Sequence, residues 1–257
     1  MKKILALILA LVCVTLCCVG CIGETPATNE NEEKPVLKMA TNAYFQPYEY
    51  YENGKIIGID AEIAAAIAEY LGYELVMEDM EFDTIITAVK EGSVDFGMAG
   101  MTVTEDRLKE IDFTNSYAKG VQAIIVPEKS PIKHVDDLYA EGASYKIGVQ
   151  QGTTGDIYAT DDFGAENVTP YNNGNNAVLA LTGGDVDCVI IDIEPAKALV
   201  AANEGLKILE TSYADEDYAI CVSKGNQELL DKINEAIVAL TKDGTIDRII
   251  AKYIPAN

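Results

Sequence analysis

The chain has 257 residues, with 42 acidic and 19 basic side chains and a formal net charge of −23. A nucleic-acid-binding protein needs a basic face to displace counterions from phosphates, so this charge argues against a nucleic-acid partner. His134 is the single histidine, so no Ser-His-Asp or Cys-His pair and no histidine-based metal site can be assembled. We therefore expect neither a metal nor a cofactor.

The first residues have the layout of a secretory signal. Lys2 and Lys3 precede an apolar run over residues 4–19, which ends among small residues before Cys21. This run is shorter than the roughly 20 residues that a bilayer-spanning helix needs, although an uncleaved anchor is an alternative. We assign residues 1–20 to a signal peptide and expect the mature chain to lie outside the cytoplasm.

The segment Cys18-Val19-Gly20-Cys21 resembles a bacterial lipoprotein cleavage box, although Leu is usual at position 18. This resemblance implies that Cys21 becomes the mature N-terminus and carries diacylglycerol, whose two acyl chains suffice for stable anchoring. Residues 21–34 are polar and predict a disordered tether. We expect a protein that is lipid-anchored to the outer face of the cell membrane, or periplasmic.

Beyond the tether, strand-like segments alternate with helical patterns, which predicts an α/β fold with largely parallel sheets. One helical stripe runs from Ile59 to Leu71 before Gly72, and another runs from Leu229 to Leu240 before Gly244. The strand-like segments are Val36–Ala40, Leu75–Met77, Tyr145–Val149, Val186–Ile191 and Ala219–Val222. Cys188 and Cys221 fall in separate strand-like segments, so we expect two buried thiols, with a disulfide bridge as the alternative.

A weak internal repeat relates two parts of the chain. Residues 87–100 read TAVKEGSVDFGMAG and residues 179–192 read LALTGGDVDCVIID. In each, a helix ends in glycine and Val-Asp opens a buried strand. The two strands are predicted to end at Gly100 and Asp192, and the carboxyl ends of parallel strands face the ligand crevice. The repeat therefore predicts two lobes that face each other across a cleft.

Several motifs, in this order and spacing from Val36 to Ile254, resemble the polar-amino-acid group of periplasmic solute-binding proteins. They are Pro47-Tyr48-Glu49-Tyr50 with Gly58-Ile59-Asp60, Phe82-Asp83, residues 99–104 (AGMTVT) followed by Arg107, Asp112-Phe113-Thr114 before Tyr117, residues 148–154 (GVQQGTT), and residues 187–192.

The resemblance implies the two-lobed type II periplasmic-binding-protein fold, with a hinge and a cleft between the lobes. Lobe 1 is expected over residues 35–118 and 218–257, and lobe 2 over residues 122–214. The chain would cross between the lobes near residues 119–121 and 215–217. The implied function is the extracytoplasmic amino-acid-binding subunit of an ABC importer, a monomer that is not an enzyme and delivers its ligand to a membrane permease.

An α-amino acid needs one fixed cation and one fixed anion. Thr104 is predicted to be a helix N-cap, which places Arg107 in the first turn of the helix. There the guanidinium group and the positive end of the helix dipole would both favour binding of a carboxylate. The alternative is that Arg107 pairs with an acidic residue on the surface. Gln150 is predicted to end a strand, and Thr153 and Thr154 to begin a helix whose free N–H groups can bind an anion. The alternative is an ordinary threonine N-cap that binds no ligand, which has the same sequence pattern.

The resemblance assigns Asp192 to the ligand's ammonium group, together with the Gly100 carbonyl and the Thr102 hydroxyl. The alternative is that Asp192 only caps the helix before Glu194-Pro195. The resemblance also places Phe45 and Phe82 against the ligand's carbon chain, with Tyr44 competing for the first role and a purely structural role open for the second.

The predicted pocket holds Arg107 as its only cation, which disfavours acidic ligands because a second buried carboxylate would lack a partner. At Asn42 the basic-amino-acid and glutamine binders typically have Asp. Gln150 and Asp156 are further candidates for side-chain contacts. We expect a polar neutral or basic amino acid. The rival is a secreted arogenate or prephenate dehydratase on the same scaffold, which needs a pocket acid with a raised pKa, for which Glu49 and Glu81 are the candidates.

Overall fold

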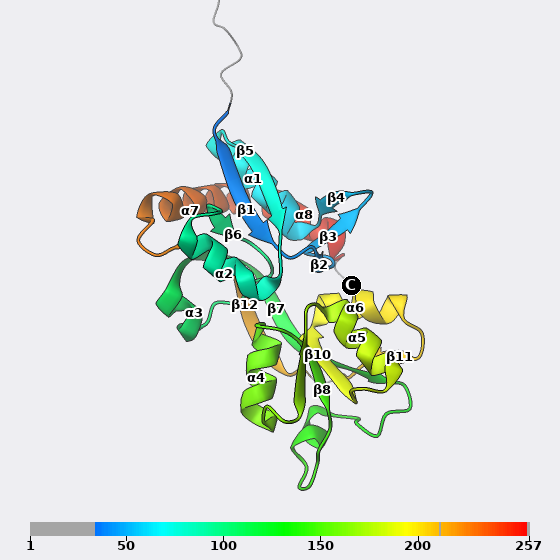
Figure 1. Cartoon of the computed structure of the whole chain (residues 1–257). Helices are drawn as coiled ribbons and strands as arrows, with labels where there is room; N and C mark the ends of the chain where they lie inside the picture. Colours follow the sequence, from blue (N-terminus) through cyan, green and yellow to red (C-terminus); the bar gives the residue numbers. More distant parts are fainter. Residues whose placement is uncertain (1–33, 211, 256–257) are drawn as a thin grey trace, which may run out of the picture. The chain divides into compact units, whose positions relative to one another are not determined.

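The computed structural model describes residues 34–210 and 212–255 (Figure 1). The predicted signal peptide, Cys21 and residues 22–33 of the predicted tether lie outside this part of the chain. Nine strands form one sheet in the order β5-β1-β6-β12-β7-β10-β8-β9, with β11 beside β7, and β2, β3 and β4 form a small second sheet.

The strands within the described ranges are β1 (Val36–Thr41), β2 (Tyr44–Phe45), β3 (Glu49–Glu52), β4 (Lys55–Ile57), β5 (Glu74–Asp79), β6 (Phe96–Gly97), β7 (Ile111–Pro127), β8 (Ile147–Gln150), β9 (Val168–Tyr171), β10 (Cys188–Asp192), β11 (Leu206–Ile208) and β12 (Ala214–Ser223). The helices are α1 (Ile59–Leu71), α2 (Phe82–Glu91), α3 (Glu105–Glu110), the 3₁₀ helix η1 (Val135–Tyr139), α4 (Thr154–Phe163), α5 (Gly174–Gly183), α6 (Ile193–Ala202), α7 (Gln227–Lys242) and α8 (Thr245–Tyr253).

The large sheet is mixed, which corrects the prediction of largely parallel sheets. β5, β1 and β6 pair in parallel, as do β10, β8 and β9. The strand β7 pairs antiparallel with β10, β11 and β12. Each parallel set is built by helical crossovers, which generate parallel neighbours, whereas β7 and β12 join the two sets.

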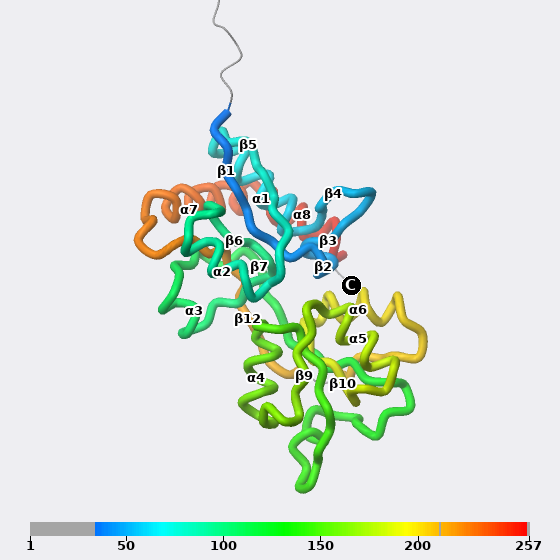
Figure 2. The backbone as a smooth tube through the Cα atoms, viewed as in Figure 1, coloured from blue at the N-terminus to red at the C-terminus, as the bar shows by residue number. Residues whose placement is uncertain are grey.

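The pair β7–β12 connects two groups of α/β elements, so that the described chain has the two-lobed architecture expected from its sequence (Figure 1). Residues 119–121 of β7 pair with residues 215–217 of β12, and these are the two segments where the crossings are predicted. Lys119 Nζ lies 2.6 Å from Asp217 Oδ1. In the tube of Figure 2 the two strands run side by side between the groups. The lobe boundaries themselves remain a prediction.

The core follows from the period-2 alternation of side chains along the strands. In β10, Val189 and Ile191 pack into the apolar cluster that contains α5 and α6 residues, whereas Cys188 and Ile190 pack into the cluster on the α4 side. In β1, Met39 packs with the apolar stripe of α1, and Ala40 packs with α2. Helices therefore cover both faces of the sheet, as an α/β fold requires.

The internal repeat is confirmed in detail. The helices α2 and α5 both end at a glycine in the left-handed conformation, Gly92 and Gly184. Asp95 accepts a hydrogen bond from the N–H of Lys38, and Asp187 accepts the equivalent bond from the N–H of Lys146, at 2.7 and 2.8 Å. The first strand is shorter than predicted, because β6 ends at Gly97 rather than at position 100.

Several smaller expectations are settled within the described residues. Cys188 and Cys221 are free and buried, so the disulfide alternative is wrong. His134 is exposed and precedes η1. Searching residues 34–210 and 212–255 finds no helix with both the length and the apolar character needed to cross a membrane.

Replacing Gly58 by alanine is expected to lower the free energy of unfolding by about 2–3 kcal/mol. Gly58 has a φ of 126°, and a Cβ atom there would lie 2.1 Å from the backbone oxygen of Tyr48. Gly72→Ala is the matched control, because Gly72 also has a positive φ of 78° but faces open space. The Gly72→Ala substitution should lower the free energy of unfolding by only about 1 kcal/mol. Chemical denaturation of both variants measures the difference, and equal costs would show that the contact with Tyr48 is relieved easily.

Candidate ligand-binding site

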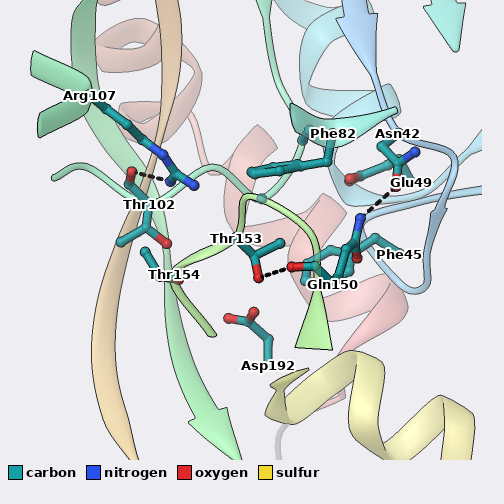
Figure 3. Close-up of a pocket in the computed structure, with 12 residues that line it drawn as sticks. Asn42, Phe45, Glu49, Phe82, Thr102, Arg107, Gln150, Thr153, Thr154 and Asp192 are labelled. Atoms are coloured by element: carbon teal, nitrogen blue, oxygen red, sulfur yellow. Dashed lines mark hydrogen bonds between the residues drawn. The ribbon is translucent and has the colours of Figure 1, made fainter. Parts of the chain in front are cut away.

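One pocket brings together all ten predicted ligand contacts (Figure 3). They come from strand ends, loops and the first turns of α2, α3 and α4, in both predicted lobes. Two further residues, Glu49 and Ala99, complete the lining. The lining residues predicted from the sequence are Asn42, Phe45, Phe82, Gly100, Thr102, Arg107, Gln150, Thr153, Thr154 and Asp192. Their roles toward a ligand remain predictions.

Arg107 is a buried cation that is held by carbonyl groups. The hydroxyl of Thr104 accepts a hydrogen bond from the Arg107 N–H and caps α3, as predicted. The guanidinium donates to the carbonyl oxygens of Thr102 at 2.8 Å and Gly152 at 3.0 Å, and lies over the ring of Phe82. No carboxylate among the described residues forms an ion pair with Arg107, so the alternative of a surface ion pair is wrong. Its charge is available to an anion in the pocket.

The turn at residues 151–153 begins α4 and presents its N-terminus to the pocket. Thr153 is the N-cap, and its hydroxyl accepts from the N–H of Asp156 and donates to the carbonyl of Gln150. The carboxylate of Asp156 accepts from the N–H of Gly152, and Asp156 is not among the lining residues. Asp156 therefore shapes the turn, while Thr154 lines the pocket at the positive end of the helix.

Asp192 occupies the N-cap position of α6, but its side chain makes no capping hydrogen bond. Its carboxylate instead accepts a hydrogen bond from Gln122 Nε2 at 2.7 Å and one from the hydroxyl of Tyr218. Burial raises the pKa of Asp192, and the neighbouring carboxyl of Glu216 adds to the rise. The purely structural alternative, a helix cap, is therefore wrong. The side chain is buried at the pocket wall.

The aromatic residues divide between pocket and surface. Phe45 and Phe82 are buried and line the pocket, and Phe45 stacks on Tyr48 at 5.7 Å between ring centroids. The competing Tyr44 is 47% exposed and lies outside the lining. Phe82 is the first residue of α2, and its ring packs in the apolar cluster under this helix. The same ring also lines the pocket.

The amide of Asn42 is already engaged at both ends. Its Nδ2 donates to the carbonyl of Met80 at 2.8 Å, and its Oδ1 accepts from Gln150 Nε2 at 3.0 Å. This second bond joins the two predicted lobes at the end of the pocket away from Arg107 (Figure 3). Asn42 therefore closes this end of the pocket.

Three buried acids close to the pocket, Glu49, Asp60 and Glu216, were not assigned to the amino-acid site by the sequence analysis, which named Glu49 only as an acid for the rival enzyme. Glu49 and Asp60 lie at one end, and Asp192 contacts Glu216 through Gln122, whose Nε2 also donates to Glu216 at 3.0 Å. Glu49 and Asp60 do stand inside the recognised motifs, so alternation of polar and aromatic residues in Pro47-Tyr48-Glu49-Tyr50 was a usable signal. Gln122 and Glu216 lie in the crossing strands, where nothing in the sequence marks them.

Buried carboxyl groups outnumber buried cations in and around the pocket. Arg107 is the one buried cation of the described residues, against the buried carboxyl groups of Glu49, Asp60, Asp192 and Glu216. Buried charges need partners, so this imbalance favours a ligand that carries more positive than negative groups, or protons on some of the carboxyls.

Two α/β lobes with a buried polar pocket at the junction of their elements define a protein that encloses a small solute. The model of the bacterial extracellular solute-binding proteins, family 3, matches residues 37–256. The chain belongs to this family.

Known proteins with the same architecture are similar over nearly their whole length. The chain is 29% identical to the arginine-binding extracellular protein ArtP of Bacillus subtilis, over 98% of each chain. A solved ancestral arginine-binding protein bound to glutamine is 38% identical with a TM-score of 0.81, over 87% of this chain and 99% of that one. A solved ancestral arginine-binding protein bound to arginine is 39% identical with a TM-score of 0.79, over 86% of this chain and 99% of that one.

Proposed function

We propose that this protein is the extracytoplasmic amino-acid-binding subunit of an ABC importer. The observation that carries the proposal is the placement of one buried guanidinium, Arg107, and one buried carboxyl group, Asp192, in the lining of a single pocket. A free α-amino acid presents a carboxylate and an ammonium group on one carbon. These two groups match Arg107 and Asp192, and the relatives named for arginine support the same class of ligand.

The ligand would hold the predicted lobes together. Contacts that already join them are the bond from Arg107 to the carbonyl of Gly152, from Gln150 to Asn42, and from Gln151 Nε2 to Asp83 at 2.7 Å. Asp192 and Arg107 belong to different predicted lobes, so an amino acid that binds both favours the closed state over the open one. The permease would recognise this closed state.

The rival proposal of a dehydratase is weaker. Glu81 is exposed and accepts a hydrogen bond from Asn172, so it does not serve as a pocket acid. Glu49 is buried and has a raised pKa, as a catalytic acid would, but the family and the relatives are binding proteins. We propose a receptor without catalytic activity.

The position in the cell follows from the family, whose members are extracellular. We propose in addition that Cys21 carries a lipid that anchors the protein to the outer face of the membrane, and that the protein acts as a monomer with the permease as its partner. Mass spectrometry of the protein purified from membranes tests the lipid, because an unmodified Cys21 would exclude it.

A thermal-shift screen with the twenty amino acids tests the proposed function. We expect a rise in melting temperature for arginine and a few other polar ligands and none for aspartate or glutamate, since a ligand at 100 times its Kd stabilises the native state by about 2.7 kcal/mol. If no amino acid raises the melting temperature, the proposed function is wrong.

A further inference from the structure

Glu49 is buried at the pocket wall, where no residue of the described part of the chain donates a hydrogen bond to it. It stands on β3 and none of its surface is exposed. Neither Oε1 nor Oε2 has a hydrogen-bond partner among the described residues. A buried carboxylate in this state is costly, so Glu49 needs either a proton or a cation. Figure 3 shows Glu49 beside Asn42, at the end of the pocket away from Arg107.

Asp60 on α1 faces Glu49 as a second, fully buried carboxyl group. Its Oδ2 accepts from the N–H of Gly100 and from the hydroxyl of Tyr117, both at 2.7 Å, which favours the ionised form. Its Oδ1 has no donor among the described residues. Two ionised carboxylates cannot hydrogen-bond to each other, so Glu49 and Asp60 become partners only when one of them carries a proton, which Glu49 can donate to Asp60.

The other titratable groups around Glu49 do not replace that proton. Asp79 at the end of β5 and Asp192 at the end of β10 act on Glu49 as like charges. Tyr48 and Tyr117 are neutral phenols, since burial raises the pKa of each above its ordinary value. The cation Arg107 stands at the other end of the pocket. Glu49 has no cationic partner among these neighbours.

We propose that Glu49 binds the cationic side-chain end of a basic amino acid and gives up, on binding, the proton that it shares with Asp60. The proposal rests on the proposed function, in which Arg107 and Asp192 hold the ligand's α-carboxylate and α-ammonium groups. A side chain that extends from that clamp toward Asn42 reaches Glu49. The proton leaves to solvent, and the guanidinium or ammonium group takes its place against the ionised carboxylate.

The affinity for a basic ligand is expected to increase with pH. Burial raises the pKa of Asp60 to about 6, and burial together with Asp60 raises the pKa of Glu49 well above its ordinary range. Above about pH 6, Asp60 is ionised and Glu49 keeps the proton. The free protein then carries one proton more than the complex with a basic ligand, so affinity for that ligand rises with pH.

The test compares arginine with citrulline, its neutral isostere, by calorimetric titration in buffers with different ionisation enthalpies. Protons that Asp192 releases are common to both ligands and cancel in the difference. We expect arginine to release roughly one proton more than citrulline, and its affinity relative to citrulline to rise up to about tenfold per pH unit above pH 6. Equal proton release by the two ligands overturns the inference, and so does a failure to bind arginine while another amino acid binds. Only the absence of binding by all twenty amino acids overturns the proposed function.

Two variants separate selectivity from proton release. Glu49→Gln should lose both the extra proton and the preference for arginine, by about tenfold or more. Asp60→Asn, whose amide can donate to Glu49, should keep a preference for arginine and lose the extra proton. The matched control is Glu52→Gln, an exposed acid on the same strand. A Glu49→Gln variant that prefers arginine as the wild type does would overturn the assignment.

Discussion

Arg107→Lys is expected to weaken amino-acid binding almost as much as Arg107→Ala, by about 2 kcal/mol or more, which is roughly thirtyfold in Kd. The guanidinium of Arg107 uses two nitrogens on the carbonyls of Thr102 and Gly152 and still offers N–H groups to the pocket. The single ammonium of lysine cannot make the two carbonyl contacts and a forked bond to a carboxylate together. Calorimetric titration with the best ligand of the thermal-shift screen measures the loss.

The control for Arg107 is Lys109→Ala in the same helix. Lys109 forms an exposed ion pair with Asp106, so its removal should change the Kd by less than about twofold. If the Arg107→Lys variant binds with wild-type affinity, a point charge is sufficient and the forked contact is wrong. A loss in the Lys109→Ala variant would show that α3 acts through its stability.

Asp192→Asn is expected to weaken binding by roughly tenfold to a hundredfold while the protein remains folded. The substitution keeps the shape of the side chain and its position between Gln122 and Tyr218, but removes the charge that faces the ligand's ammonium group. Asparagine also brings donors of its own toward Gln122, so part of the loss reflects a disturbed orientation. Titration at neutral pH, with circular dichroism to verify the fold, measures the effect.

Glu194→Gln, in the first turn of the helix α6 that follows Asp192, is the matched control, because Glu194 pairs with Lys197 and lies outside the pocket lining. Its affinity should stay within about twofold of the wild type. If Asp192→Asn lowers the melting temperature strongly while the folded fraction binds normally, then Asp192 supports the fold rather than the ligand, and the proposed clamp is wrong.

The sequence by itself determined the α/β class, the repeat and the pocket residues that follow strands or begin helices. These features depend on local physics: an apolar stripe that ends at Gly72, an N-cap at Thr104, and an aspartate that opens a strand at positions 95 and 187. Each of these features depends on a few neighbouring residues, so it can be recognised from the sequence alone. The resemblance to a family then supplied the order in which such segments assemble.

Only the tertiary structure decided which buried acids have donors and which do not. Glu49 and Asp60 are close in sequence but meet through the packing of β3 against α1, and Gln122 reaches Asp192 and Glu216 across three strands. The same packing brings the amide of Asn42 into hydrogen bonds with Met80 and Gln150, which close one end of the pocket. Burial and hydrogen bonding of a side chain depend on groups brought from distant parts of the chain, and no local pattern records them.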